Sequence, residues 1–159
     1  MTQGNRIGIG KLVLLAGLVG GAAEVLWVML YSSVTDTSGA VVAQQVTASV
    51  WPAAAAWSLA PMLGVAIHMA LALALAALCA PPLLRIAARH AAPGVIMMTA
   101  IMVLTLVWAV NFFLVLPVIN PGFIALMPYG ATLISKMLFG LAMAVVVRRN
   151  ALRALPAQF

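Results

Sequence analysis

Charged residues are scarce in this sequence, and acidic residues are the scarcest. Of its 159 residues only 6% are charged and 66% are hydrophobic, and the acidic residues are Glu24 and Asp36 alone. Soluble domains usually carry about a quarter charged residues and about half apolar ones. The composition therefore excludes an ordinary soluble domain and predicts an integral membrane protein that has the lipid bilayer as its main partner.

Cysteine and the common catalytic motifs are lacking as well. The single cysteine, Cys79, excludes a disulfide within the chain and any CxxC chemistry. The sequence has no Walker loop, HExxH, GxSxG or dinucleotide fingerprint, and it predicts no cofactor and no metal site. It therefore favours a non-enzymatic protein and leaves a membrane-embedded acid–base site as the open alternative.

What the sequence does contain is four long apolar runs. A membrane-spanning helix needs about 20 such residues. The runs lie at approximately residues 12–33, 59–84, 95–116 and 129–147, and prolines stand at the ends of several of them. Because the runs are continuous, they do not fit the alternating strands of a membrane barrel. The sequence predicts one all-α membrane domain, a bundle of four transmembrane helices.

Basic residues predict the orientation of this bundle. Seven of them flank the apolar runs, namely Arg6, Lys11, Arg85, Arg89, Arg148, Arg149 and Arg153. The loops at residues 34–58 and 118–128 contain neither lysine nor arginine. The positive-inside rule then places both termini in the cytoplasm of a bacterial-type inner membrane. It also explains the net charge of +6 as a topology signal, which excludes a nucleic-acid partner.

Both outer loops carry local structural signals. In the first loop Asp36 is a candidate N-cap, and valines recur at every fourth residue after it. This pattern predicts a short helix within Thr37–Trp51, lying at the membrane interface. In the second loop the apolar stretch Phe123–Met127 is expected to pack against the bundle or a partner rather than face water.

Three ionisable residues fall inside the predicted spans at similar depths. At about 1.5 Å per residue, Glu24 lies about 12 Å from the outer surface, Lys136 about 11 Å and His68 about 14 Å. Asn111, on the third span, lies nearer the outer face. Intramembrane ionisable residues mark functional sites by default.

Helical periodicity places these residues on the small or polar faces of their helices. The three stripes are Gly17, Gly20, Gly21 and Glu24; Gly64, His68 and Ala72; and Thr132, Ser135, Lys136, Phe139 and Gly140. A buried acid and a buried base at one depth are each more stable as a pair than alone. We predict a Glu24–Lys136 ion pair with His68 beside it and Asn111 capping it on the outer side. Thr132 and Ser135 complete the predicted polar cluster.

Each of these residues also has a simpler interpretation. Glu24 can be a neutral acid bonded to a backbone carbonyl, and Lys136 can extend toward the outer headgroups. His68 can be a packing residue, and Asn111 can form a hydrogen bond between helices. The cluster is thus either a binding site or a structural element.

One local resemblance bears on Glu24. The stretch GGAAEVLWVML, with a lone glutamate in the first of four spans, resembles the first helix of the small multidrug resistance transporters. The resemblance implies that Glu24 matches the shared proton and drug site of that family. It covers about eleven residues; this chain is longer, has a larger first loop and adds Lys136 and His68. A lysine beside the carboxylate would neutralise the charge that attracts cationic drugs.

Three functions follow from these features. The leading hypothesis is an accessory or assembly component of a membrane complex, because the chain has little mass outside the membrane and its outer loops are apolar. The alternative is a small proton-coupled transporter or ligand-binding protein that uses Glu24, Lys136 and His68. The third is a haem- or quinone-associated redox subunit, which rests on His68 alone. The expected partners are other membrane subunits or further copies of the chain.

Overall fold

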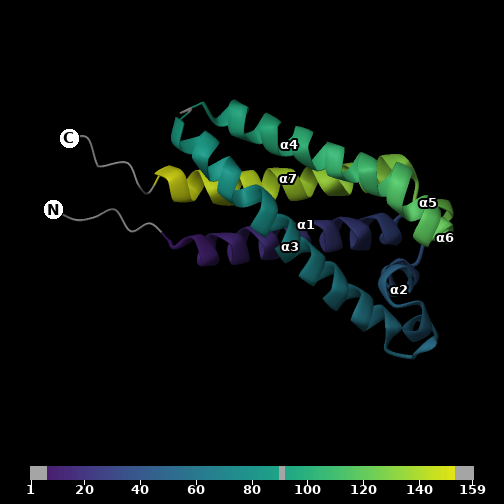
Figure 1. Cartoon of the computed structure of the whole chain (residues 1–159). Coiled ribbons are helices and arrows are strands. Elements are labelled where there is room, and N and C mark those ends of the chain that lie inside the picture. Colours follow the sequence, from purple (N-terminus) through teal and green to yellow (C-terminus); the bar gives the residue numbers. More distant parts are fainter. Residues whose placement is uncertain (1–6, 90–91, 153–159) are drawn as a thin grey trace.

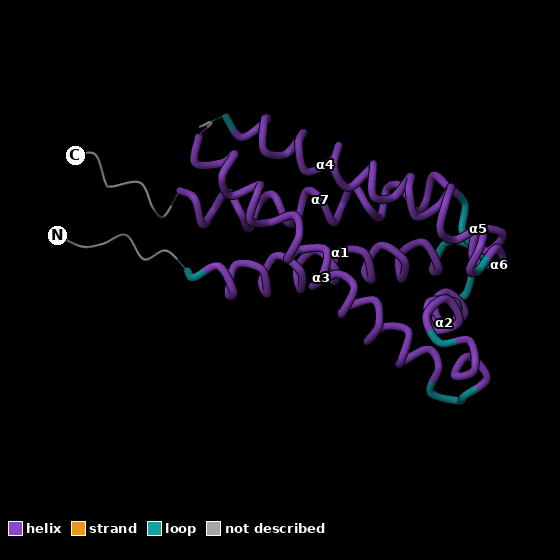
Figure 2. The backbone as a smooth tube through the Cα atoms, viewed as in Figure 1, coloured by secondary structure: helices purple, strands orange, loops and turns teal. Residues whose placement is uncertain are grey.

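The computed structural model describes residues 7–89 and 92–152, and in these ranges the chain is helical and contains no β-strand (Figures 1 and 2). Four helical segments are long and apolar enough to cross a membrane. They are α1 (Ile9–Ser33), α3 (Ala60–Arg89), α4 (Pro93–Val110) with its continuation to Ile119, and α7 (Tyr129–Leu152). The prediction of an all-helical chain with four membrane-length helices is confirmed.

Helix α3 runs well past the end expected from its sequence. Pro81 and Pro82 lie inside the helix, which continues to Arg89. Proline removes a backbone N–H and crowds the preceding turn, so in water it usually ends a helix. In membrane helices the freed carbonyl groups find other partners. Here Ala80 and Leu83 on either side of the prolines are buried in the core, so packing holds this segment in the helix.

The third long helix changes its winding near its end. At Asn111 it enters a π-helical turn, η2 (Asn111–Val115), in which the Leu116 N–H bonds the Asn111 carbonyl, and it then continues as α5 (Leu116–Ile119). Pro117 follows and has no N–H to offer the carbonyl four residues before it. A π turn is wider than an α turn, so it shifts the angular positions of the side chains that follow Asn111.

Helix α1 packs between α3 and α7, and α4 packs on α7, so that α4 forms one edge of the bundle (Figure 1). Helices α1, α7 and α4 run roughly side by side, whereas α3 crosses them obliquely and its first half diverges from α1. The main core lies among all four helices and consists largely of alanine, leucine and other apolar side chains, with Phe139 fully buried in it. This arrangement makes α1 the helix that both α3 and α7 can reach.

Glycines on α1 allow that close approach. A Cβ added at Gly17 would lie 2.9 Å from the Leu73 Cα of α3, and one added at Gly20 would lie 2.9 Å from the Phe139 ring of α7. Real Cβ atoms do not approach backbone or ring atoms so closely, so any larger residue would push the helices apart. The glycine stripe therefore allows α3 and α7 to pack closely on the face of α1 that carries Glu24.

A cap of shorter helices closes the other end of the bundle. It contains α2 (Gly39–Val50), η1 (Pro52–Ala56) and α6 (Pro121–Leu126). Figure 1 shows α2 end-on, in the space where α3 diverges from α1. The expected helix in the first outer loop is thus present, but its N-cap is Ser38 rather than Asp36, which lies in the preceding loop. Ser38 makes no side-chain capping bond.

Hydrogen bonds fasten this cap. The side-chain amide of Asn120 donates to the Gln45 backbone carbonyl at 3.0 Å and to the Ser49 hydroxyl at 2.9 Å, which joins the start of α6 to α2. The Thr47 hydroxyl donates to the Ala60 carbonyl at 2.6 Å, which joins α2 to α3. Met127, just before α7, is buried against Val42 of α2. The chain itself therefore partly covers the apolar stretch Phe123–Met127, whereas Val118 and Ile119 before it are exposed.

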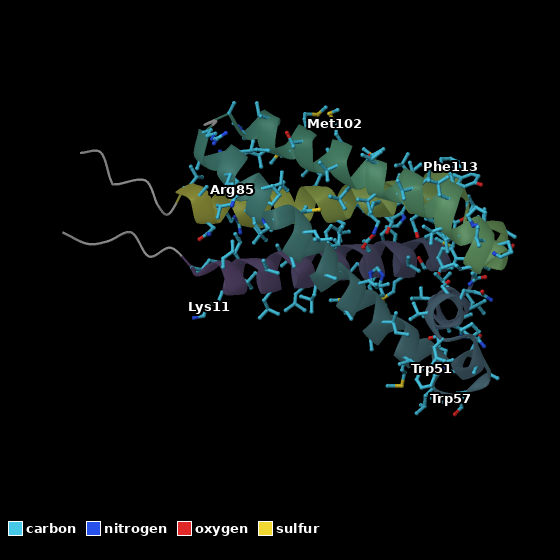
Figure 3. All side chains as sticks on the ribbon, viewed as in Figure 1. Lys11, Trp51, Trp57, Arg85, Met102 and Phe113 are labelled. Atoms are coloured by element: carbon cyan, nitrogen blue, oxygen red, sulfur yellow. The ribbon has the colours of Figure 1, made fainter. Side chains whose placement is uncertain are left out.

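The basic residues gather at the opposite end. The Ile7 N–H donates to Asn150 Oδ1 at 3.2 Å, so the start of α1 meets the end of α7. Figure 3 shows Lys11 and Arg85 at this same end, far from Trp51 and Trp57 of the cap. Arg6 and Arg153 lie outside the described residues. One basic residue, Lys136, lies within α7 away from this end.

Candidate functional site

Glu24 is the acidic residue of the membrane-spanning helices, and it is buried. It follows Gly17, Gly20 and Gly21 on the inner face of α1 and is only 4% exposed. An ionised carboxylate at such a place requires partners, because the cost of removing it from water is large. Two other helices provide them.

Lys136 of α7 is the nearer partner. Its Nζ lies 2.7 Å from Glu24 Oε1, a distance typical of a charge-assisted hydrogen bond. The same Nζ lies 5.4 Å from the centre of the Phe139 ring, within the range of a cation–π interaction. Phe139 also packs on Gly20, so the ring that fixes the spacing of α1 and α7 also supports the lysine. Lys136 thus lies toward Glu24.

His68 of α3 approaches the other carboxylate oxygen. Its Nε2 lies 3.6 Å from Glu24 Oε2, which is longer than a hydrogen bond. This nitrogen is buried and has no hydrogen-bond partner among the described residues. Buried polar atoms are nearly always hydrogen-bonded, and the carboxylate that this nitrogen approaches is the acceptor it could bond when it carries a proton. The structure therefore brings together the three ionisable residues of the predicted cluster.

The two hydroxyl residues of the predicted cluster are buried on α7, and their roles differ. The Trp108 indole donates to Thr132 Oγ1 at 3.0 Å. The Thr132 hydroxyl in turn donates toward the carbonyls of Pro128 and Tyr129, where α7 begins. Thr132 therefore belongs to a contact between α4 and α7, one helical turn before Lys136 in the sequence. Ser135 is buried directly before Lys136, on the face of α7 that packs into the bundle.

Asn111 does not cap the ion pair. It is exposed on the face of its helix that points away from the bundle, where it lines a shallow surface depression together with four apolar residues. The buried face of this helix follows Leu104, Trp108, Phe112 and Leu116 at intervals of four, through the π turn. That progression turns Asn111 outward, away from Glu24. The expectation of an outer cap on the pair was wrong for this reason.

Several contacts around the site carry no sequence signal of their own. The Trp27 indole donates to the Ala131 carbonyl at 2.8 Å and joins α1 to α7 one turn past Glu24. Phe139 was visible on the lysine stripe, but nothing in its spacing indicated that it packs on Gly20. These contacts depend on how the helices cross, which local periodicity does not determine.

The charges of the site define what it can do. As ions, Glu24 and Lys136 cancel, and a neutral His68 leaves the cluster without net charge. A proton added to the imidazole would make Nε2 a donor that faces the carboxylate, and the cluster would gain one positive charge. Among the described residues, no three His, Cys, Asp or Glu side chains gather as a metal site would require.

No family model, curated protein or solved structure matches the chain. The likeness to the small multidrug resistance transporters is thus confined to residues 20–30. The geometry also departs from that likeness, because Lys136 already occupies the carboxylate that would attract a cationic drug.

Proposed function

We propose that this chain is a small proton-coupled transporter or ligand-binding protein, and that Glu24, Lys136 and His68 form its site. One observation carries the proposal, namely that Glu24, Lys136 and His68 come from three different helices and meet inside the bundle, with His68 Nε2 at 3.6 Å from Glu24 Oε2. Ionisable residues within membrane helices commonly mark proton or ligand sites.

This proposal reverses the order of the hypotheses drawn from the sequence. The accessory role was motivated by the lack of catalytic motifs, the small mass outside the membrane and the apolar outer loops. The last of these motives is weakened, because Met127 is buried and Phe123 and Leu126 pack around Val42 of α2. The haem hypothesis is not favoured either, since the His68 nitrogen that would reach an iron faces Glu24 instead.

An accessory membrane subunit remains the second candidate, and the ion pair itself favours it. At 2.7 Å, Lys136 and Glu24 form a direct ion pair, as they would in a contact that only positions helices. The two candidates differ in whether the cluster exchanges protons in the physiological pH range.

Site-specific NMR in nanodiscs distinguishes them. Glu24 is the only glutamate of the chain, and a His90→Gln background with a histidine-free tag leaves His68 as the only histidine. Labelled glutamate and histidine then report on the site without further assignment. We expect the His68 signal to change as the pH is varied over the physiological range and the Glu24 signal to change with it, because the imidazole and the carboxylate face each other. Signals that both stay constant over this range would reject the proton-coupled site and leave the structural pair.

We also propose a topology for the chain. Both termini lie in the cytoplasm of a bacterial inner membrane, and α2 lies at the outer interface. The support is the shared position of Lys11 and Arg85 at one end of the bundle and Trp51 and Trp57 at the other, since Trp favours interfaces and basic residues favour the inner side.

Reporter fusions test this topology. A fluorescent protein that matures only in the cytoplasm should be active after Phe159, and a phosphatase that folds only in the periplasm should be active when inserted at Asp36. Asp36 precedes α2 in an exposed loop, so the insertion leaves the described helices intact. Active phosphatase at the C-terminus would overturn the orientation.

A further inference from the structure

Asn111 is a polar residue on the lipid-facing side of an edge helix. The helical segment from Pro93 to Ile119 is 27 residues long, so it spans about 40 Å, and Asn111 lies about 12 Å from its outer end. A hydrocarbon core of about 30 Å centred on this segment would contain Asn111. Its short side chain cannot extend to the headgroups from there as a lysine can.

The carboxamide of Asn111 has no hydrogen-bond partner among the residues that the structure describes. Its neighbours on the surface are apolar, since Val110 and Leu114 are exposed and a depression of about 400 Å³ is lined by Leu106, Val107, Val110, Asn111 and Val115. An amide in such a setting is unfavourable, because lipid tails offer it no hydrogen bonds. Something polar must therefore meet it within the membrane.

A second copy of this chain fits the requirement. A carboxamide is self-complementary, because it has one acceptor oxygen and an N–H₂ donor group, so two of them related by a two-fold axis exchange two hydrogen bonds. Two copies of α4 meeting at Asn111 also place the exposed side chains beside it, such as Leu114, against the depression of the partner. A single asparagine in an otherwise apolar helix seam fixes register and oligomeric state.

We propose that the chain forms a two-fold symmetric homodimer through the outer half of α4 and η2, with Asn111 paired to Asn111 of the second copy. The position of α4 at the edge of the bundle leaves this face open (Figure 1). The pair of Glu24 and Lys136 lies on the opposite side of α7, so the dimer is independent of the proposed proton site.

Disulfide cross-linking in native membranes tests the geometry. In a Cys79→Ala background, single cysteines are placed at Val110 and Leu114, beside Asn111, and at Leu30 and Leu78, which are also exposed, on α1 and α3. We expect rapid oxidation to covalent dimers at 110 and 114 only. Cross-links at 30 or 78 instead, or at no position, would overturn the proposed interface.

A second measurement tests the role of the carboxamide. The dimer is diluted in lipid vesicles and its dissociation followed by energy transfer between labelled copies. Asn111→Leu is expected to weaken the dimer by roughly tenfold, as the loss of two interhelical hydrogen bonds implies, whereas Asn111→Gln keeps the chemistry and should retain part of the affinity.

The matched control is Thr105→Val, which makes a similar polar-to-apolar change on the same helix. Thr105 lies six residues before Asn111, so its side chain points about 120° away from that of Asn111 around the helix axis. It should leave the dissociation constant unchanged. A monomer in all variants, or a dimer of equal strength with Asn111→Leu, would reject the proposal. Because Asn111 is exposed, the variant should fold as the parent does, and thermal unfolding checks this.

Discussion

Glutamine in place of Glu24 is expected to destabilise the bundle by about 3 kcal/mol, because Lys136 is left without its counter-charge. In soluble proteins, breaking a buried ion pair from one side costs roughly 3–5 kcal/mol, and membrane values tend to be smaller. Lys136→Met should do comparable harm, since it leaves the carboxylate, 5% exposed, without its nearest cation. The matched control is Lys11→Met, which removes an exposed lysine of the same helix as Glu24.

The double variant Glu24→Gln with Lys136→Met distinguishes pairing from mere proximity. Removing both partners of a buried pair is often close to neutral, so the double variant should unfold at a higher temperature than the worse single variant. Thermal unfolding of the four proteins in detergent provides the measurement. Strictly additive losses, or two harmless single substitutions, would show that the pair does not stabilise the folded bundle.

The approximate place of this pair could be predicted from the sequence. Depth follows from a constant rise per residue, and the inward face follows from the glycines that precede Glu24 on α1. Both are local properties of a helix, so they survive any arrangement of the helices. The depth of His68 belongs to the same class of inference, although its contact with Glu24 also requires α3 to pack on α1.

Contacts that depend on the crossing of helices could not be predicted in this way. Asn111 is exposed because the face of its helix that packs on α7 runs through Trp108 and Phe112 instead, which the sequence of that helix alone does not indicate. The Trp108–Thr132 hydrogen bond requires α4 and α7 to be neighbours, which no periodicity in either helix indicates. The length of α3 beyond Pro82 likewise depends on core packing around Leu83 rather than on local propensity.

The packing of α2 on α3 also depends on how the helices cross, and it leads to a second prediction with a large effect. Gly64 of α3 lies directly under Ala43 of α2, and a Cβ at this glycine would collide with the Ala43 carbonyl. The obstacle is backbone, which cannot rotate away as a side chain can. The same Cβ would lie 3.0 Å from the Thr47 hydroxyl, which bonds the Ala60 carbonyl.

Gly64→Ala should therefore push α2 off α3 and weaken the Thr47–Ala60 hydrogen bond, with a loss of roughly 1–3 kcal/mol as in overpacked cores. The control is Gly10→Ala on α1, where an added Cβ meets nothing within 4 Å. In a helix this change should be neutral or slightly stabilising, because alanine favours helix more than glycine does. Hydrogen exchange adds the local readout: amides of Gly39–Val50 should exchange faster in Gly64→Ala while those of α7 stay protected. Equal stability and equal exchange in the two variants would mean that α2 does not pack on Gly64 as the structure shows.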